Sequence, residues 1–316
     1  VQIVDDRCEQ IPFGEHTDLV AITVEVFTAK RSYEISAQYR KQGIPVVLGG
    51  FHPTLIPEEA LQHANAIVTG DAEPVWLKVI ADCKAGRLQR HYHGQTHEIQ
   101  SGVLPRRDLF KGKGYLPISL IQFGRGCRYA CEFCAISVFF KQRYACRPVD
   151  DVVREIEAQD RKLVFFVDDN VVADPSKSKD LFRKLIPLRI RWVSQGSIDM
   201  ACDSELLDLM CESGCLGHVI GFESVNPDAL TGMKKTPNLT HFDRYESAIA
   251  ILKQYGLQTW AAFTLGSDTD TRQSLYDLLD FALHHKFTFA AFNVLMPYYG
   301  TPFYAHLAAQ GRLLYQ

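Results

Sequence analysis

The chain has 316 residues, of which 47% are hydrophobic and 22% are charged, and its formal net charge is −3. These proportions are ordinary for a globular protein, and the length predicts two domains. The weak negative charge and the lack of a basic cluster give no argument for a nucleic-acid partner, and no apolar run reaches the ~18–20 residues of a membrane span.

Residues 1–86 alternate between short β-branched runs and helical segments. Strands are predicted at residues 1–4, 19–26, 44–48 and 66–69, and helices at residues 32–42, 57–63 and 73–83. The run at residues 44–48 is apolar throughout, as expected for a strand buried on both faces of a parallel sheet. The alternation predicts a doubly wound α/β domain, whose ligands bind beyond the carboxyl ends of its strands.

Residues 87–117 contain several Gly and Pro residues and are predicted to form a linker between two domains. His91, His93 and His97 lie in this segment with spacings of two and four residues. Metal ligands can have such spacings, but a solvated loop is the interpretation that we favour.

Residues 118–316 alternate again between strands and helices. Strands are predicted at residues 118–123, 163–167, 191–198, 218–222, 259–265 and 289–295, and helices at residues 149–160, 178–185, 204–213, 240–255 and 271–284. Asp203 is expected to cap the helix at residues 204–213. Six units are too few to close an eightfold barrel, so we predict an open, partial (β/α)6 barrel. Polar residues at the carboxyl ends of its strands should face the active site.

Nine cysteines are present, and they are unevenly spaced. An odd count in a long chain without a secretory signal argues against a disulfide framework and for the reducing cytoplasm. The clustered cysteines are therefore predicted to bind metal. A second group, Cys202, Cys211 and Cys215, could form an auxiliary cluster, but buried thiols are the interpretation that we favour, with Cys211 and Cys215 on one helix.

The segment from Gly124 to Cys134 reads GRGCRYACEFC, and it places Cys127, Cys131 and Cys134 at spacings of four and three residues. Such a loop can wrap three thiolates around one iron–sulfur cubane and leave one iron open. Gly124 and Gly126 let the backbone turn closely around the metal. The alternatives are a zinc site with a fourth ligand such as Cys146 or a distant His, or three buried free thiols.

The CxxxCxxC spacing, with an aromatic residue before the last Cys at the end of the first barrel strand, resembles the radical S-adenosylmethionine (SAM) superfamily over about residues 118–312. The resemblance implies a [4Fe-4S] cluster on the three cysteines. It also implies reductive cleavage of SAM to a 5′-deoxyadenosyl radical that abstracts a substrate hydrogen. An electron donor such as flavodoxin or ferredoxin would supply the electron.

The same resemblance implies contacts with SAM at the strand ends, by Phe133, Asp168, Asp169, Ser197, Asp199, Glu223 and Gly266. Phe133 matches the aromatic residue that packs near adenine, and Glu223 matches an acid that contacts the ribose or the methionine part. Asp168-Asp169-Asn170 stands where the family carries Gly-Gly-Glu, which is absent here. For Asp168, Asp169 and Glu223, the alternative is a role as a helix cap or a place in a solvated loop.

Residues 1–86 resemble the cobalamin-binding domain that precedes many radical SAM enzymes, on Asp18-Leu19-Val20-Ala21-Ile22-Thr23, the Gly49–Thr54 run GGFHPT and Gly70-Asp71-Ala72-Glu73. The resemblance implies cobalamin contacts at Thr23, Gly49, Gly50 and His52. It further implies that the domain begins at its second strand. A DxHxxG motif is absent, so no His of that motif would ligate cobalt. A vestigial domain without a cofactor is the alternative.

The combined resemblance implies cobalamin-dependent methylation of an unactivated carbon in a small-molecule substrate. The aromatic-rich segment at residues 287–304 suggests that this substrate is apolar. A non-methylating radical enzyme for cyclisation, ring contraction or oxidation is one alternative. A non-catalytic iron–sulfur or redox-sensing module is another. A tRNA methylthiotransferase is disfavoured, because neither a basic appended domain nor a second cysteine set is found.

Overall fold

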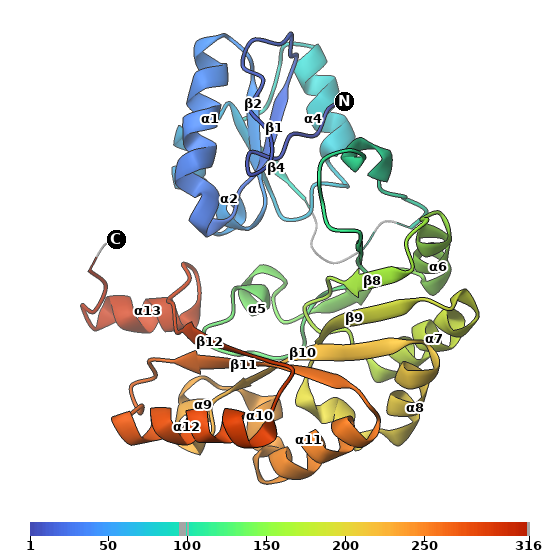
Figure 1. The fold of residues 1–316 in the computed structure, drawn as a ribbon. Helices are drawn as coiled ribbons and strands as arrows, with labels where there is room; N and C mark the ends of the chain where they lie inside the picture. The colour runs from blue at the N-terminus through green and yellow to red at the C-terminus, as the bar shows by residue number, and fades with distance from the viewer. Residues whose placement is uncertain (95–98, 100, 315–316) are drawn as a thin grey trace. The chain divides into compact units, whose positions relative to one another are not determined.

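The computed structural model describes residues 1–94, 99 and 101–314, and its contacts divide the chain into two units (Figure 1). The first unit comprises Val1–Gln100 and Pro105–Tyr115, and the second comprises Ser101–Leu104 and Leu116–Gln316. Most of the segment predicted as a linker therefore clusters with the first unit. In the described part of the chain, no helix has both the length and the apolarity that crossing a bilayer requires.

The first unit contains a four-stranded parallel sheet with its strands in sequence order. The strands are β1 (Val20–Thr23), β2 (Val46–Gly49), β3 (Ala66–Thr69) and β4 (His91–His93). The helices are η1 (Val26–Thr28), α1 (Ala29–Lys41), α2 (Phe51–Leu55), α3 (Pro57–Gln62), α4 (Trp76–Lys84) and η2 (Arg107–Phe110).

Helices cover both faces of this sheet, as the apolar run of β2 predicts. Val46 and Leu48 pack in one core with residues of α1 and α3. Val47 packs in a separate core with Val79 of α4. Because successive side chains of a strand point to opposite faces, β2 is buried on both sides, and the doubly wound fold is confirmed.

Two local predictions for the first unit are wrong. Residues 1–4 form no strand, because a β-branched run becomes a strand only where a neighbouring strand pairs with its backbone. Residues 91–93, predicted to be loop, form the edge strand β4 beside β3. Tyr92 anchors β4, since its ring is buried and its hydroxyl donates to Asp82 at 3.0 Å. A single apolar residue between two histidines gives too short an alternation to be recognised. His97 lies outside the described residues.

The second unit contains a six-stranded sheet in the order β12-β11-β10-β9-β8-β5, and every neighbouring pair is parallel. The strands are β5 (Ser119–Ile121), β8 (Leu163–Phe166), β9 (Arg191–Gly196), β10 (Cys215–Glu223), β11 (Gln258–Leu265) and β12 (Phe289–Val294). Within the described residues β5 and β12 are the two edges, so the sheet is open and the predicted partial (β/α)6 barrel is confirmed.

Helices line one side of this sheet, and Figure 1 shows α7, α8, α11 and α12 along it. The helices of the unit are α5 (Ala135–Phe139), α6 (Val149–Glu157), α7 (Pro175–Leu185), η3 (Ile186–Leu188), η4 (Ile198–Cys202), α8 (Ser204–Glu212), α9 (Pro227–Gly232), α10 (Thr236–Thr240), η5 (Phe242–Arg244), α11 (Tyr245–Gln254), α12 (Arg272–His285) and α13 (Pro302–Ala309). The main core between sheet and helices includes Phe166, Trp192, Phe222 and Phe263. The Asp203 carboxylate accepts from the Leu206 amide at 3.0 Å, which confirms the predicted cap of α8.

In this unit, the structure differs from the sequence-based predictions mainly near the loops. The cysteine segment is framed by an antiparallel pair that was not predicted, β6 (Gly124–Gly126) with β7 (Tyr144–Cys146). The helix predicted at residues 240–255 begins only at Tyr245, after the 3-10 turn η5. Short elements such as these are fixed by tertiary contacts, and their sequences carry too little periodicity to reveal them.

Candidate functional site

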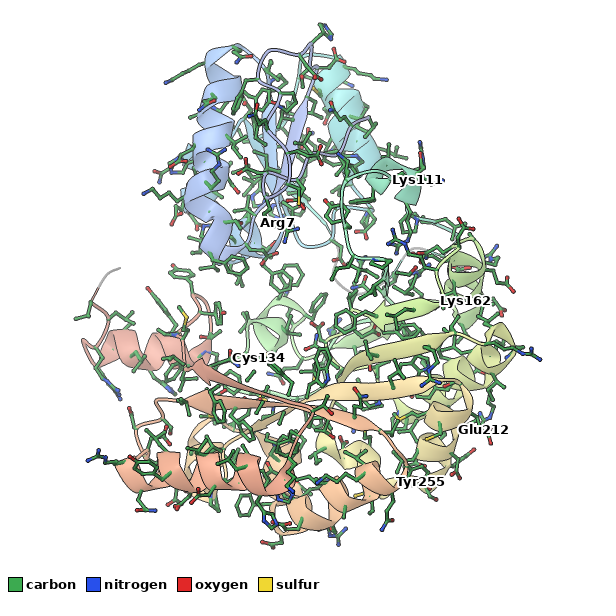
Figure 2. All side chains as sticks on the ribbon, in the orientation of Figure 1. Arg7, Lys111, Cys134, Lys162, Glu212 and Tyr255 are labelled. Atoms are coloured by element: carbon green, nitrogen blue, oxygen red, sulfur yellow. The ribbon has the colours of Figure 1, made fainter. Side chains whose placement is uncertain are left out.

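The three predicted thiols lie in the loop between β6 and α5, and Figure 2 labels Cys134 at the start of α5. Gly126 has φ +83°, and a Cβ there would lie 2.1 Å from the Arg143 carbonyl oxygen. A Cβ at Gly124 would lie 2.4 Å from the Tyr144 hydroxyl. The two glycines are therefore needed so that β6 can approach the strand that follows the loop. The further prediction, that Gly124 and Gly126 let the backbone turn closely around the metal, stays a prediction.

Backbone contacts hold the loop in a fixed shape. The Cys134 amide donates to the Cys131 carbonyl at 3.2 Å, and the Ser137 hydroxyl donates to the Cys134 carbonyl at 2.7 Å. The Glu132 amide donates to the Met233 carbonyl at 3.0 Å, which ties the loop to the segment between α9 and α10. The thiols are thus presented by a backbone that is hydrogen-bonded on both sides.

Burial makes two of these thiols, Cys127 and Cys131, poor acids until a metal takes up their charge. It raises the pKa of Cys127, and it raises the pKa of Cys131 to about 11, although the Lys235 ammonium opposes the shift at Cys131. Thiolates are the metal-binding form, so metal binding must displace protons here.

The number of thiols suits a cluster better than a single zinc ion. The loop supplies three thiols, whereas a structural zinc site takes four ligands. Three Cys thiolates on a cubane leave one iron open. The donor set therefore fits an iron–sulfur cluster with three protein ligands.

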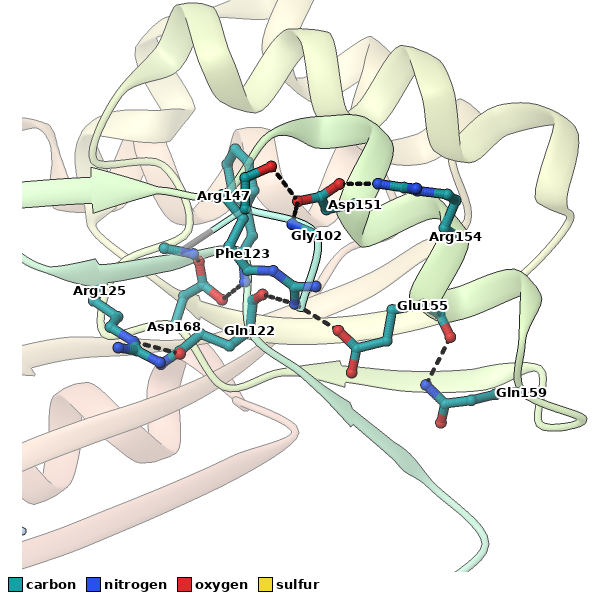
Figure 3. Close-up of polar contacts among 12 residues, drawn as sticks. Gly102, Gln122, Phe123, Arg125, Arg147, Asp151, Arg154, Glu155, Gln159 and Asp168 are labelled. Carbon is teal, nitrogen blue, oxygen red and sulfur yellow. Dashed lines mark hydrogen bonds and ion pairs between the residues drawn. The ribbon is translucent and has the colours of Figure 1, made fainter. Parts of the chain in front are cut away.

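Asp168 and Asp169, which follow β8, hold the backbone that leads into the cysteine loop. The Asp168 carboxylate accepts from the amides of Phe123, at 2.9 Å, and Gly124 (Figure 3). The Asp169 carboxylate accepts from the Gly126 amide at 2.9 Å. Both oxygens of Asp168 thus accept from backbone amides, whereas Asp169 contacts the loop through one oxygen.

Asp168 is fully buried, and burial raises its pKa to about 7 although the two backbone amides oppose the shift. The native carboxyl therefore keeps a proton up to about pH 7, whereas in the unfolded chain it releases the proton near its ordinary value of 3.8. Between these values unfolding releases protons, so this group's contribution to stability declines as pH rises.

We expect the Asp168→Asn variant to be less stable than the wild type by about 1–3 kcal/mol at pH 4 to 5. The NH2 group of the asparagine is a donor, and it would face a backbone amide that is also a donor. The difference between the two free energies of unfolding should narrow as the pH rises toward 7, since only the wild type loses stability through ionisation at this position. Urea titrations of both proteins at several pH values, followed by tryptophan fluorescence, measure the difference. A gap that widens with pH would contradict this account.

Polar side chains at the end of β8 and after β9 also meet the cysteine loop. The Asn170 amide donates to the Ser197 hydroxyl at 3.0 Å and hydrogen-bonds the Cys127 thiol. The Asp199 carboxylate accepts from the Tyr129 hydroxyl at 2.9 Å and from Arg128 at 3.2 Å. Its other oxygen, Oδ1, is buried and has no hydrogen-bond partner. The predicted residues of β8 and β9 thus converge on one loop, and Asp199 keeps one free acceptor.

Glu223 ends β10 with a bulge and a left-handed backbone, φ +64°, which is uncommon for a residue with a side chain. Its carboxylate accepts from the Lys235 ammonium at 2.7 Å and from the Thr264 hydroxyl at 2.6 Å. The side chains of Glu223 and Lys235 are only 10% and 17% exposed. Gly221 makes room for this pair, since a Cβ there would lie 2.4 Å from the Glu223 carboxylate.

Lys235 links this pair to the cysteine loop, and no sequence motif indicates this role. Its Nζ lies 5.9 Å from the ring centroid of Phe133. Burial disfavours its charge, but the Glu223 carboxylate and the neighbouring thiols Cys131 and Cys134 outweigh burial and raise its pKa. A fixed cation therefore lies beside the thiols.

Gly266 follows β11 with φ +98°, and its amide donates to the Asp270 carboxylate at 2.7 Å. A Cβ at this position would meet no atom within 4 Å, so the turn leaves open space. The auxiliary group of cysteines is dispersed. Cys202 and Cys211 are exposed, and Cys215 is buried in β10 at 3.3 Å from a ring nitrogen of His218. The prediction of buried thiols is confirmed for Cys215 and wrong for Cys202 and Cys211. The placement of Cys211 and Cys215 on one helix is also wrong, because α8 ends between them.

In the first unit, the predicted cobalamin contacts gather at the carboxyl ends of β1 and β2. Thr23 ends β1 and Gly49 ends β2. Gly50 has φ +105°, and a Cβ there would lie 2.9 Å from the Val24 carbonyl oxygen. His52 is 4% exposed, and its Nε2 lies 2.9 Å from the Tyr33 hydroxyl.

His52 also has an unused polar atom. Its Nε2 lies 3.2 Å from the Glu59 carboxylate, whereas its Nδ1 is buried and has no hydrogen-bond partner. Buried polar atoms are nearly always hydrogen-bonded, so this ring nitrogen, in the first turn of α2, is available to a ligand or a water molecule. The histidines of β4 differ, because His91 and His93 both contact the Thr69 hydroxyl, at 2.9 and 3.3 Å.

Comparison with known proteins agrees with this geometry. The sequence model of the Radical SAM superfamily matches residues 121–282. The chain is 29% identical to bacteriochlorophyllide d C-12(1)-methyltransferase of Chlorobaculum tepidum, over 92% of this chain and 66% of that protein. It is 25% identical to bacteriochlorophyllide d C-8(2)-methyltransferase of the same organism, over 98% of this chain and 73% of that protein.

Among solved structures, the fold matches TsrM from Kitasatospora setae, a radical SAM methyltransferase solved with cobalamin and a [4Fe-4S] cluster bound. The TM-score is 0.79 at 21% identity, and the match covers 94% of this chain and 68% of that one. The likeness confirms the predicted fold class. The chain thus spans about two thirds to three quarters of the length of these relatives.

Proposed function

The chain belongs to the radical SAM superfamily, and from this premise we propose that it binds a [4Fe-4S] cluster at Cys127, Cys131 and Cys134 and cleaves SAM reductively. We further propose that it uses cobalamin to methylate an unactivated carbon. The observation that carries the proposal is the set of three loop thiols, of which Cys131 is buried and the other two are half-buried, beside a fixed ammonium group. When bound, the cluster supplies the electron that cleaves the sulfonium, and cobalamin supplies the methyl group.

Lys235 is the residue best suited to hold the charged end of SAM. Its ammonium group lies over Phe133 and close to the thiols, so it can pair with a carboxylate bound beside the cluster. Glu223 uses both carboxylate oxygens to hold Lys235 and Thr264, and we assign it the orientation of Lys235. Phe133 offers an apolar ring for the adenine, as its motif position implies.

Asp199 and Asp169 are the acids with capacity left for a ligand. The buried and unpartnered Oδ1 of Asp199 can accept from a hydroxyl or ammonium group of SAM. Asp169 engages one oxygen with Gly126. Asp168, with both oxygens on backbone amides, positions the strand, and Ser197 orients Asn170 toward Cys127. We propose that the open space at the Gly266 turn accommodates the nucleotide part of SAM.

The methyl-transfer part of the proposal rests on the relatives and on the first unit. Both relatives named above are methyltransferases, and the matched structure holds cobalamin. In this chain Thr23, Gly49 and Gly50 form the close strand-end turns in which we place cobalamin. The orphaned Nδ1 of His52 is the polar atom there that lacks a partner, and we propose that it hydrogen-bonds the cofactor without ligating cobalt.

An apolar small-molecule substrate fits the side chains at and beyond the end of β12. Val294, the last residue of β12, is 72% exposed, and Met296 and Tyr299, which follow it, are 58% and 40% exposed. A flavodoxin or ferredoxin would deliver the electron. All nine cysteines are free thiols, which is why we place the protein in the reducing cytoplasm.

Product analysis tests the proposed reaction. The protein is reconstituted anaerobically with iron and sulfide, and dithionite, SAM and methylcobalamin are then added together with a candidate apolar substrate. We expect 5′-deoxyadenosine and S-adenosylhomocysteine to form along with a methylated product. We also expect the visible spectrum of added cobalamin to change on binding to the protein.

Each alternative predicts a different outcome of this assay. Deoxyadenosine without S-adenosylhomocysteine indicates a non-methylating reaction such as cyclisation or oxidation. A fully loaded cluster that produces no deoxyadenosine indicates a redox module and overturns the enzymatic proposal. An unchanged cobalamin spectrum indicates that the first unit carries no cofactor.

A further inference from the structure

Outside the candidate active site, Glu246, His284 and His285 bring three metal-ligating atoms within 4.8 Å of one another. Glu246 lies in the first turn of α11, and the two histidines lie in the last turn of α12. The Glu246 carboxylate and Nε2 of His285 are 3.1 Å apart. Two neighbouring helices thus present an oxygen ligand and nitrogen ligands to the same point.

The inner ligand of this group is held rigidly. The His285 side chain is only 6% exposed, and its ring lies 4.4 Å from that of Phe281 and 5.7 Å from that of Phe287, centroid to centroid. Glu246 is 70% exposed and His284 is also exposed. A metal ion could therefore reach the group from solvent and meet one ligand that is already ordered by packing.

The charges around the group are compatible with a cation. The C-terminal end of α12 carries the partial negative charge of its last carbonyl groups, and Glu246 adds a full one. Lys253, seven residues after Glu246, donates to the carbonyl oxygen of His285 at 2.6 Å. Its ammonium group is thereby bound to the helix end and leaves the imidazole nitrogens and the carboxylate to a metal.

The distance between Glu246 and His285 suits a tetrahedral site. Ligands at about 2.0–2.1 Å from a zinc ion are about 3.3 Å apart in tetrahedral geometry, close to the 3.1 Å between Glu246 and His285. We infer that Glu246, His284 and His285 form a site for a divalent metal ion of the zinc type, with water as the fourth ligand. The metal would clamp α11 to α12, and it would be independent of the iron–sulfur cluster.

Zinc binding by matched variants tests this inference. Cluster-loaded wild-type protein and His284→Ala are titrated with Zn2+ under anaerobic conditions, so that binding by loop cysteines cancels in the comparison. His284 is exposed, and its replacement removes one edge contact of the His285 ring, 5.0 Å between centroids, but leaves the contacts of that ring with Phe281 and Phe287. His16→Ala, which removes an exposed histidine from the other unit, is the control.

The wild type and His16→Ala should bind one more equivalent of Zn2+ than His284→Ala. Micromolar Zn2+ should raise their midpoint of thermal unfolding by roughly 5 °C, as expected for an ion that binds only the folded state. Glu246→Gln should behave like His284→Ala. If all four proteins bind the same number of zinc ions and show the same thermal shift, Glu246 and His285 form an ion pair only, and the inference is wrong.

Discussion

Replacing Cys131 by Ala will abolish the formation of 5′-deoxyadenosine from SAM. Cys131 is the most buried of the three loop thiols, and hydrogen bonds fix its carbonyl group and the amide of the next residue. Two remaining thiolates cannot hold three corners of a cubane, so both iron content and cleavage should be lost. We expect a fall in cleavage rate of about 10³-fold or more, which corresponds to about 4 kcal/mol in activation free energy.

The measurement combines iron and sulfide analysis with chromatography of the nucleoside products after anaerobic reconstitution. Cys202→Ala is the matched control, because Cys202 is an exposed thiol of the same unit that lies outside the loop. This control should retain wild-type iron content and cleavage. If Cys131→Ala loads a full cluster and cleaves SAM at the wild-type rate, the assignment of the loop as the cluster site is wrong.

The barrel and the thiol loop could be predicted from sequence because their signals are local. A strand such as β8 carries its own apolar run, and the next helix follows within a short distance in the chain. The three thiols likewise lie within eight consecutive residues, so their spacing alone shows that one loop presents them. Where residues that lie close in space are also close in sequence, the sequence pattern is enough to predict the local structure.

The remaining features depend on partners that are distant in sequence. Lys235 follows another lysine in a polar segment, and only the bulge at Glu223, twelve residues earlier, gives it a partner. Asp168 was expected to contact SAM, but in the fold the amides of Phe123 and Gly124 lie within reach and take both its oxygens. An acidic residue at a strand end can bind a ligand or accept hydrogen bonds from backbone amides. The residue type alone does not distinguish these two roles.

Lys235→Met will weaken SAM binding and also destabilise the fold. The ammonium group lies among Glu223, Phe133 and the thiols, so its removal takes away the cation that we pair with the SAM carboxylate. We expect about 10²-fold weaker binding of SAM, within the range for loss of one partner of a buried charge pair. Glu223 would keep Thr264 but lose its counter-charge, at a cost of about 3 kcal/mol in stability.

The double variant Glu223→Gln with Lys235→Met separates these two effects. Glutamine carries no charge, so it removes the unpaired buried carboxylate while its amide can still contact Thr264. Stability should recover by about 2 kcal/mol or more relative to the single lysine variant, since the two positions are in direct contact and their effects do not add. SAM binding should stay weak, because neither new side chain provides a cation.

Isothermal titration of the cluster-loaded proteins with SAM and denaturant titration of the same proteins measure the two quantities independently. Lys235→Arg should recover part of the SAM affinity, because guanidinium also pairs with carboxylates, though its planar shape and different reach change the geometry. If the double variant regains both stability and SAM affinity, Lys235 serves only to neutralise Glu223. The cation beside the cluster would then have no part in holding the nucleotide, and another group would have to meet the SAM carboxylate.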